Sequence, residues 1–484
     1  MKFGAKLWFK AGLAASALLG SVVLLYLLWA GGFFLPEWVT WKSEKLSDNS
    51  GEYEIVLAHK KVQVLYQDNI FWTSPDEIKV QQVLSCDIDN DSQDELLLLS
   101  WKRGRFGNHK PFWVEKDEST WSQHLFVYEY HPDEIRPKWM SSYIGQDVTA
   151  ISGNGKSAPH SRLLLTDPEG HVSSWFWDSW GFTKEDTDIT FVAFGDLLAH
   201  ESIYNYGLHN DKEFRFLFEN FKEILSGSDI AVINQETPLT DNPALFSDYP
   251  RFGTPVNVGQ AIVDAGFDVV TCATNHALDQ GTDGIHFTRD FFVSNNVLCL
   301  GTQSESESKY RPYEVITRNG VKFALLNYTY GTNGIPLPDA CSSMVHLLEN
   351  EEKIREDMKQ AKNEADFVIV FVHWGTEDSL EPDTFQQKWA KIFLDGGVDV
   401  VIGTHSHTLQ PYEVLTDDVG HEMLIFYSLG NFISAQPEKS CVKGGMATFT
   451  VSLTSTGYRI TEYDLKPLEI TWQRCGKYTV KIAE

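Results

Sequence analysis

Two histidines one residue apart, His405 and His407, closely follow an apolar run at residues 398–402. Such a run followed by Gly403 is typical of a buried strand that opens into a loop. Strands buried on both faces occur in parallel sheets covered by helices, and ligands bind beyond the carboxyl ends of such strands. Imidazoles two residues apart in an extended loop can bind one cation or two neighbouring ones. By itself, such a pair is more often two exposed loop histidines. Other residues of the chain must therefore show whether the pair belongs to a metal site.

Four earlier apolar runs also end in side chains that can bind a cation, and helix-length segments separate the runs. The residues at these strand ends are Asp196, Glu236, Asn275 with His276, and His373. A single polar residue at such a place is usually a helix cap. Five strand ends of this kind at one sheet edge, with no cysteine among them, predict a first-row metal site with mixed nitrogen and oxygen ligands.

The chain is long enough for two or three domains, because 484 residues exceed one ordinary core. Strands that alternate with helices over residues 186–470 predict an α/β domain with a largely parallel sheet. Residues 36–185 are rich in aromatic side chains and short alternating runs, which predict a small β-rich domain. We interpret its tryptophans as core and rim residues, and a polymer-binding platform is the alternative. Residues 471–484 are expected to be a C-terminal tail.

A stretch of the β-rich domain carries oxygen ligands at alternating positions. These candidate calcium ligands are Asp87, Asp89, Asp91 and Glu95. A hard cation such as Ca²⁺ prefers carboxylates in this arrangement. The stretch is not an EF-hand, because Ser92 stands at the sixth position and Leu98 at the twelfth. It resembles the calcium loops of FG-GAP-type propeller repeats and predicts a calcium site; a solvated acidic turn is the alternative.

The N-terminal residues predict a membrane anchor. Residues 11–35 carry no charge, and three lysines lie within residues 1–10. At about 1.5 Å per residue, a helix of this length exceeds the roughly 30 Å hydrocarbon core of a bilayer. The lysines before the run and Glu37 after it predict a cytoplasmic tail (1–10), a transmembrane signal anchor (11–35) and an extracytoplasmic bulk. We therefore expect a single-pass protein of the cell membrane, and a cleaved signal peptide is the alternative.

The charge balance excludes some partners. Forty lysines and arginines stand against 67 aspartates and glutamates, for a net charge of −27. We expect no nucleic-acid partner, since phosphates require a basic face. A polyanionic substrate would also be repelled unless cations in the site reverse the local field. The six cysteines are scattered without a CxxC pair, which excludes a disulfide scaffold.

Seven runs spread over about half of the chain resemble the CapA family, the poly-γ-glutamate capsule synthesis proteins, which are related in fold to calcineurin-like metallophosphoesterases. The matching runs are FGD at 194–196, NQETPLT at 234–240, AGFDVV at 265–270, TNHALDQG at 274–281, HWGTE at 373–377, VIGTHSH at 401–407 and YSLGNF at 427–432. The resemblance implies a metallophosphoesterase-like layered sheet core with helices.

The resemblance also implies roles for the strand-end residues. One or two divalent ions, of Mn, Zn or Fe, are implied. Their ligands are Asp196, Glu236, Asn275, His373, His405 and His407, with Glu236 bridging the two ions. His276 is implied as the general acid beside them. Further polar residues that we expect at the substrate rim are Arg251, Glu377 and Asn431.

Three positions depart from the phosphoesterase pattern. Leu198 stands where the first motif has a histidine ligand, and His200 lies too far along the chain to replace it. The bridging position is Glu236 instead of aspartate, and Ala277 stands where an acid often follows the histidine. A single-ion site, or a binding site in the same pocket, is therefore an alternative to a complete two-metal hydrolase.

Three functions are compatible with these observations. The first is a membrane-anchored metal-dependent hydrolase or transferase acting on a phosphoester or an anionic surface polymer of the poly-γ-glutamate type. The second is a non-catalytic component that binds, exports or anchors the polymer beside a membrane synthase complex. The third is an adhesin or structural surface protein, which leaves the strand-end ligands unused. We expect the first.

Overall fold

The computed structural model describes residues 20–26, 28–29, 35–105, 113–141, 144–154, 161–211, 213–304, 309–339, 341–454, 457–473 and 476–483. The chain divides into two compact units. We call the first, Met1–Thr187 with Ser452–Arg459, the β-rich unit. The second, Asp188–Val451 with Ile460–Glu484, is the α/β unit.

The expectation of a single-pass membrane anchor over residues 11–35 is contradicted. No helix among the described residues is long and apolar enough to cross a bilayer, which requires about 20 residues. The described helical residues of this stretch are 20–26 and 28–29. Residues 1–19, 27 and 30–34, including the expected tail at 1–10, lie outside the described part of the chain.

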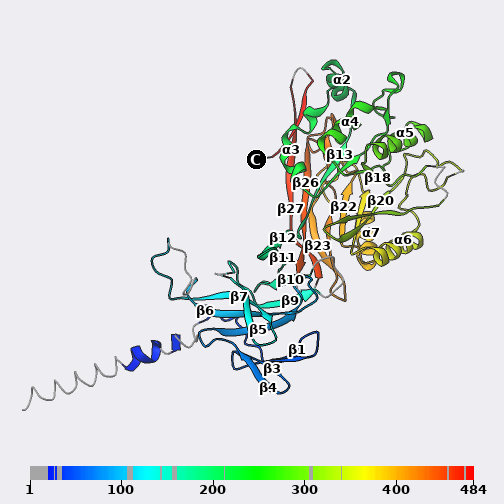
Figure 1. Ribbon diagram of the computed structural model, residues 1–484. Helices are drawn as coiled ribbons and strands as arrows, with labels where there is room; N and C mark the ends of the chain where they lie inside the picture. The colour runs from blue at the N-terminus through cyan, green and yellow to red at the C-terminus, as the bar shows by residue number, and fades with distance from the viewer. Residues whose placement is uncertain are drawn as a thin grey trace, which may run out of the picture. The chain divides into compact units, whose positions relative to one another are not determined.

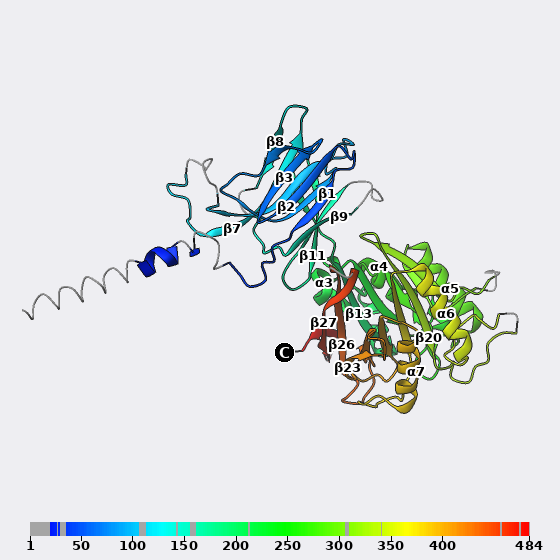
Figure 2. The ribbon, with the colours of Figure 1, turned by 90° about the horizontal axis from the view of Figure 1, so that it is seen from below.

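The β-rich unit contains, in its described residues, three four-stranded antiparallel sheets, which Figures 1 and 2 show from two sides. Alternation decides which side chains form its core: Ile55 and Leu57 are buried on one face of their strand. The small β-rich domain expected from the alternating runs is therefore present. Its strands are β1 (Glu44–Ser47), β2 (Tyr53–Ala58), β3 (Lys61–Tyr66), β4 (Asn69–Thr73), β5 (Lys79–Cys86), β6 (Glu95–Arg103), β7 (Trp121–Tyr130), β8 (Ile135–Met140), β9 (Ala150–Asn154), β10 (Arg162–Thr166), β11 (Val172–Asp178) and β12 (Gly181–Glu185).

The first large sheet of the α/β unit has the strand order β18-β17-β14-β13-β26-β27-β28, and β25 also pairs with β13. β13, β14, β17 and β18 run parallel, whereas β26 is antiparallel to β13. Its strands are β13 (Ile189–Leu197), β14 (Ile230–Gln235), β17 (Val269–Thr271), β18 (Leu298–Leu300), β25 (Asn431–Ile433), β26 (Lys443–Thr454), β27 (Gly457–Trp472) and β28 (Tyr478–Ile482). A short pair, β15 (Leu239–Thr240) and β16 (Thr254–Pro255), forms a separate ribbon.

The second large sheet has the order β19-β20-β21-β22-β24-β23. Its four central strands are parallel, and the two edge strands are antiparallel to their neighbours. β21 reads FVIVFVH and is buried at every residue, as expected for a parallel strand covered on both faces. The strands are β19 (Tyr313–Arg318), β20 (Val321–Thr329), β21 (Phe367–His373), β22 (Val400–Thr404), β23 (Tyr412–Thr416) and β24 (Glu422–Phe426).

The two large sheets contact each other through aromatic side chains. Phe191 of β13 stacks on Phe449 of β26 and meets Phe323 of β20 edge-on, with ring centroids 5.0 Å apart.

Helices cover the sheets, and α6 and α7 lie beside β20 and β22 (Figure 1). The helices are α2 (Glu201–His209), α3 (Lys222–Ser226), α4 (Val256–Ala265), α5 (Gly281–Ser294), α6 (Glu351–Glu364) and α7 (Thr384–Asp395), with 3-10 turns at Arg215–Leu217, Glu219–Phe221 and Pro243–Leu245. The expected α/β class is confirmed, with the parallel strands divided between two sheets instead of one.

Candidate metal centre

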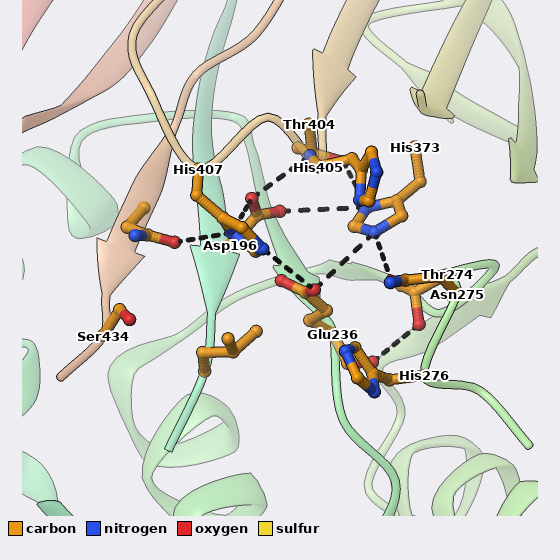
Figure 3. A network of polar contacts seen from close by, with 12 residues as sticks. Asp196, Glu236, Thr274, Asn275, His276, His373, Thr404, His405, His407 and Ser434 are labelled. Atoms are coloured by element: carbon orange, nitrogen blue, oxygen red, sulfur yellow. Dashed lines mark hydrogen bonds and ion pairs between the residues drawn. The ribbon is translucent and has the colours of Figure 1, made fainter. Parts of the chain in front are cut away.

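The carboxyl ends of strands from both sheets deliver polar side chains to one buried place (Figure 3). Asp196 lies near the end of β13, and Glu236 follows β14. His373 ends β21, and the His405-x-His407 loop follows β22. The six expected ligands, together with His276, are each no more than 5% exposed: Asp196, Glu236, Asn275, His276, His373, His405 and His407. The structure therefore brings the strand-end residues together although they come from two separate sheets.

Asp196 is held by neutral donors. Its Oδ1 accepts a hydrogen bond from Asn234 Nδ2 at 2.7 Å, and its Oδ2 accepts one from the backbone N–H of His405 at 3.1 Å. Asn234 is itself fixed, because its Oδ1 accepts from the Thr271 hydroxyl at 2.9 Å. His407 Nδ1 lies 3.3 Å from Asp196 Oδ2. The carboxylate is thus aimed at the histidine loop by residues of β14 and β17.

Glu236 is buried in the cluster without hydrogen-bond partners for its carboxyl oxygens among the described residues. Its side chain is 1% exposed. Oε1 lies 3.7 Å from His373 Nε2 and 3.9 Å from His407 Nε2. Burial, followed by the charge of Asp196, raises the pKa of Glu236 well above its usual range. A buried carboxylate without partners is costly, and a cation among these atoms would satisfy it.

His373 has one nitrogen on each side of the cluster. Nδ1 lies 2.9 Å from the Thr404 hydroxyl and Nε2 lies 2.9 Å from Asn275 Oδ1. Burial lowers the pKa of His373 well below its usual value, so the imidazole is neutral, as a metal ligand must be. A partner on the second ring nitrogen, here Thr404, is the usual way in which a ligating histidine is oriented.

The loop after β22 has an unusual backbone. His405 and His407 have φ values of 92° and 59°, in the left-handed region that residues other than glycine rarely adopt. Gly403, two residues before His405, lets its backbone lie close to Tyr427. A Cβ at this position would lie 2.0 Å from the Tyr427 carbonyl oxygen. His405 Nδ1 is buried without a partner in the described structure, and burial lowers the pKa of His405 well below its usual value. Strained residues of this kind are concentrated at functional sites.

His407 lies between the two carboxylates. Burial disfavours its charged form, but Glu236 and Asp196 together raise its pKa to about 10, so a cation that binds His407 must displace a proton from this imidazole. Its Nδ1 is also 3.0 Å from Asn431 Oδ1. We expect Asn431 at the rim from the sequence, yet the structure places it in the interior with 0% exposure. The reason is that it begins β25, which pairs with β13 beside Asp196.

His276 is paired with a residue that sequence reasoning missed. Its Nδ1 lies 2.6 Å from Asp279 Oδ2, which also accepts the backbone N–H of Phe252 at 2.8 Å. The side chains of both members of this pair are almost fully buried. Asp279 is three residues after His276, in the turn that precedes α5, and this short spacing between an acid and a histidine is a signal that could have found it. Thr274 ties the loop to β14 by donating to the Glu236 carbonyl oxygen at 2.6 Å.

Four other residues that the sequence singles out lie in different surroundings. Arg251 is exposed, as expected of a rim residue. Glu377 is exposed as well, but it groups with His405 and His407, with one ligand atom of each residue within 4.8 Å of the others. Leu198 is buried, and His200 does not replace it: His200 Nδ1 accepts the Ala435 backbone N–H, and its Nε2 lies 4.0 Å from Asp248.

Two of the expected calcium ligands of the β-rich unit form ion pairs with the ammonium group of Lys138. Asp87, Asp89 and Glu95 lie together, whereas Asp91 is exposed and accepts the backbone N–H of Gln93. Lys138 Nζ of β8 lies 2.6 Å from both Asp89 Oδ2 and Glu95 Oε1. It also lies 3.0 Å from a third carboxylate, on β7. The ammonium group of Lys138 therefore pairs with two of the four expected calcium ligands, Asp89 and Glu95, and the calcium site stays a prediction.

Known capsule proteins match the α/β unit. PGA biosynthesis protein CapA of Bacillus subtilis (strain 168) is 29% identical over 258 residues, which are 52% of this chain and 65% of that protein. Capsule biosynthesis protein CapA of Bacillus anthracis is 28% identical over 273 residues, 52% of this chain and 61% of that protein. The match thus spans less than two thirds of either relative.

Solved structures give weaker likenesses. A phosphatase of Mycoplasma pneumoniae has a TM-score of 0.38 at 16% identity, covering 58% of this chain and 93% of that one. The calcineurin-like phosphoesterase YfkN of Bacillus subtilis has a TM-score of 0.32 at 15% identity, covering 58% and 91%. Scores this low support no statement about activity.

The model of one protein family matches half of this chain. The family described as bacterial capsule synthesis protein PGA_cap matches residues 190–436, which is half of the chain and includes every residue of the buried cluster. This match confirms the resemblance to CapA, and the chain belongs to the PGA_cap family of bacterial capsule synthesis proteins.

Proposed function

We propose that this protein is a metal-dependent hydrolase or transferase that acts on an anionic polymer of the bacterial surface, of the poly-γ-glutamate type, or on a phosphoester. The observation that carries the proposal is Glu236: a buried carboxyl group whose two oxygens have no hydrogen-bond partner among the described residues and face the nitrogens of His373 and His407. A bound cation would give both oxygens a partner.

The residues present fit a divalent cation. Asp196, Glu236 and His407 lie with one ligand atom each within 4.8 Å of the others and would hold a first ion. Asn275, His373 and His405 would hold a second, with Glu236 between the two. Nitrogen and oxygen donors without a thiolate suit Mn, Zn or Fe. When bound, such ions activate water and neutralise charge on the reacting group.

His276 is the residue that would transfer a proton. The carboxylate of Asp279 holds Nδ1 of the imidazole at 2.6 Å, so the proton on that nitrogen is fixed and Nε2 is left for the substrate. To act as a general acid the ring must also carry a proton on Nε2, and the charge of the Asp279 carboxylate favours that doubly protonated ring. The Nε2 proton is the one that would pass to a leaving oxygen or nitrogen. The exposed guanidinium of Arg251 is the candidate contact for the anionic substrate at the rim.

A non-catalytic role is the second candidate, and Leu198 favours it. This buried leucine replaces a histidine ligand of the phosphoesterase pattern, and His200 is engaged elsewhere. A site with fewer ligands would still bind a polyanion through a cation. In that role the protein would bind, export or anchor the polymer beside a synthase complex.

Turnover assays separate the two candidates. Purified protein loaded with Mn²⁺, Zn²⁺ or Fe²⁺ is given a generic phosphodiester and, separately, poly-γ-glutamate. We expect turnover that falls by roughly 10²–10⁴-fold in His276→Ala with metal content unchanged. Metal-dependent polymer binding without turnover supports the second candidate. Protein that neither turns over nor binds either compound with any of these metals contradicts both.

A further inference from the structure

The first motif of this chain leaves one ligand position without a donor. Leu198 has an apolar side chain that cannot bind a cation, and it is 2% exposed. His200, two residues on, points its nitrogens at Ala435 and Asp248. A protein donor that takes this position would therefore come from another part of the chain.

Glu377 is a carboxylate beside two histidines of the site. Its carboxylate groups with one ring nitrogen each of His405 and His407, all within 4.8 Å of one another. His407 is also a member of the group formed by Asp196 and Glu236. The two groups thus share one imidazole, and Glu377 extends the buried cluster toward solvent.

The loop that carries Glu377 is fixed against the histidine loop. The backbone N–H of Asp378 donates to the carbonyl oxygen of Ser406, at 2.9 Å, between the two histidines. At the next residue, the Ser379 carbonyl oxygen accepts hydrogen bonds from the Thr408 hydroxyl and from Gln410 Nε2. The position of Glu377 beside His405 and His407 is therefore set by its backbone, although its side chain is exposed.

We infer that Glu377 is a ligand of a cation in this site and supplies the donor that Leu198 does not. The inference rests on the proposed metal-dependent function and specifies one of its ligands. A carboxylate in place of an imidazole makes the site harder and shifts its preference toward Mn²⁺. Because Glu377 is exposed, the ion that it binds faces the solvent side, from which a polymer must arrive.

The test compares metal binding by the full chain with that of two variants, Glu377→Gln and Glu381→Gln. Glu381 is an exposed acid of the same loop outside the candidate metal groups of the described residues, and is the matched control. Each protein is equilibrated with Mn²⁺, and bound metal is measured by elemental analysis and by competition with a fluorescent chelator. Unfolding in EDTA checks that the variants fold alike.

We expect Glu377→Gln to weaken binding of one ion by at least about tenfold, while Glu381→Gln binds as the wild type does. Equal binding by all three proteins overturns the role of Glu377 and leaves the proposed metal site standing. Wild-type protein with less than about a tenth of an ion per chain overturns the proposed function, and this inference with it.

Discussion

At the scale of single residues, the site is built from buried groups whose partners are incomplete without a cation. Asp196 is satisfied by neutral donors, but Glu236 and His405 Nδ1 have no partner in the described structure. A folded protein tolerates such groups where function requires them. The sequence alone predicts the ligand types because each follows an apolar run. It does not show which of them are left unpartnered, since that depends on contacts between distant strands.

Asp279→Asn tests how His276 is held. The amide keeps the shape of the side chain but removes the negative charge that stabilises the doubly protonated ring. It can also donate to Nδ1, which shifts the tautomer of the neutral ring. We expect turnover to fall by about 10²-fold or more with metal content unchanged. The tautomer of His276, read by ¹⁵N NMR, should shift in the variant whether or not a substrate is known. Asp283→Asn, an exposed acid of α5, is the control. An unchanged tautomer would remove the role given to Asp279.

At the scale of elements, the pairing of strands determines which charged side chains lie next to each other. Lys138 of β8 and Glu95 of β6 are 43 residues apart in the chain, yet their charged groups lie 2.6 Å apart because β7 pairs with both strands. The carboxylate spacing of the 87–95 stretch is visible in the sequence. The lysine that neutralises it is not, because only the register of three strands brings it there.

Lys138→Met should convert this cluster into a calcium-dependent one. Loss of the ammonium leaves three carboxylates close together, and we expect the variant to be less stable by roughly 2–4 kcal/mol. Ca²⁺ should then raise the melting temperature of the variant but leave that of the wild type unchanged. Thermal unfolding followed by tryptophan fluorescence, with and without Ca²⁺, measures both. A wild type that is stabilised by Ca²⁺ as strongly as the variant would show that the lysine does not take the place of the ion.

At the scale of the whole molecule, the alternation of strands and helices predicts the α/β class, and the short alternating runs predict the β-rich unit. The division of the parallel strands between two sheets was not predictable, since apolar runs do not reveal which strands pair. The membrane helix that we expect over residues 11–35 is contradicted by the described residues, among which no helix is long and apolar enough to cross a bilayer. Of this run, the structure describes residues 20–26, 28–29 and 35. The net charge of −27 remains a reason why an anionic polymer needs cations in the site.

The stability of the whole protein should fall as the pH is lowered, in part through His346. Burial lowers the pKa of this histidine to about 3, whereas an unfolded histidine titrates near 6.5. Between these values the unfolded chain binds one more proton than the folded chain, so stability is lost on going from about pH 6.5 to about pH 3. In His346→Gln, the slope of unfolding free energy against pH should be smaller by up to about 1.4 kcal/mol per pH unit. Urea unfolding across this range measures it, with His209→Gln as an exposed control. Equal slopes in variant and wild type would refute the assignment.

The most direct test of the central claim is anomalous diffraction from crystals of this protein grown with Mn²⁺. We predict a peak within coordinating distance of Asp196, Glu236 and His407, and its height should fall in Asp196→Asn. Ordered crystals that contain Mn²⁺ in the medium but show no anomalous density among these three side chains would contradict the claim.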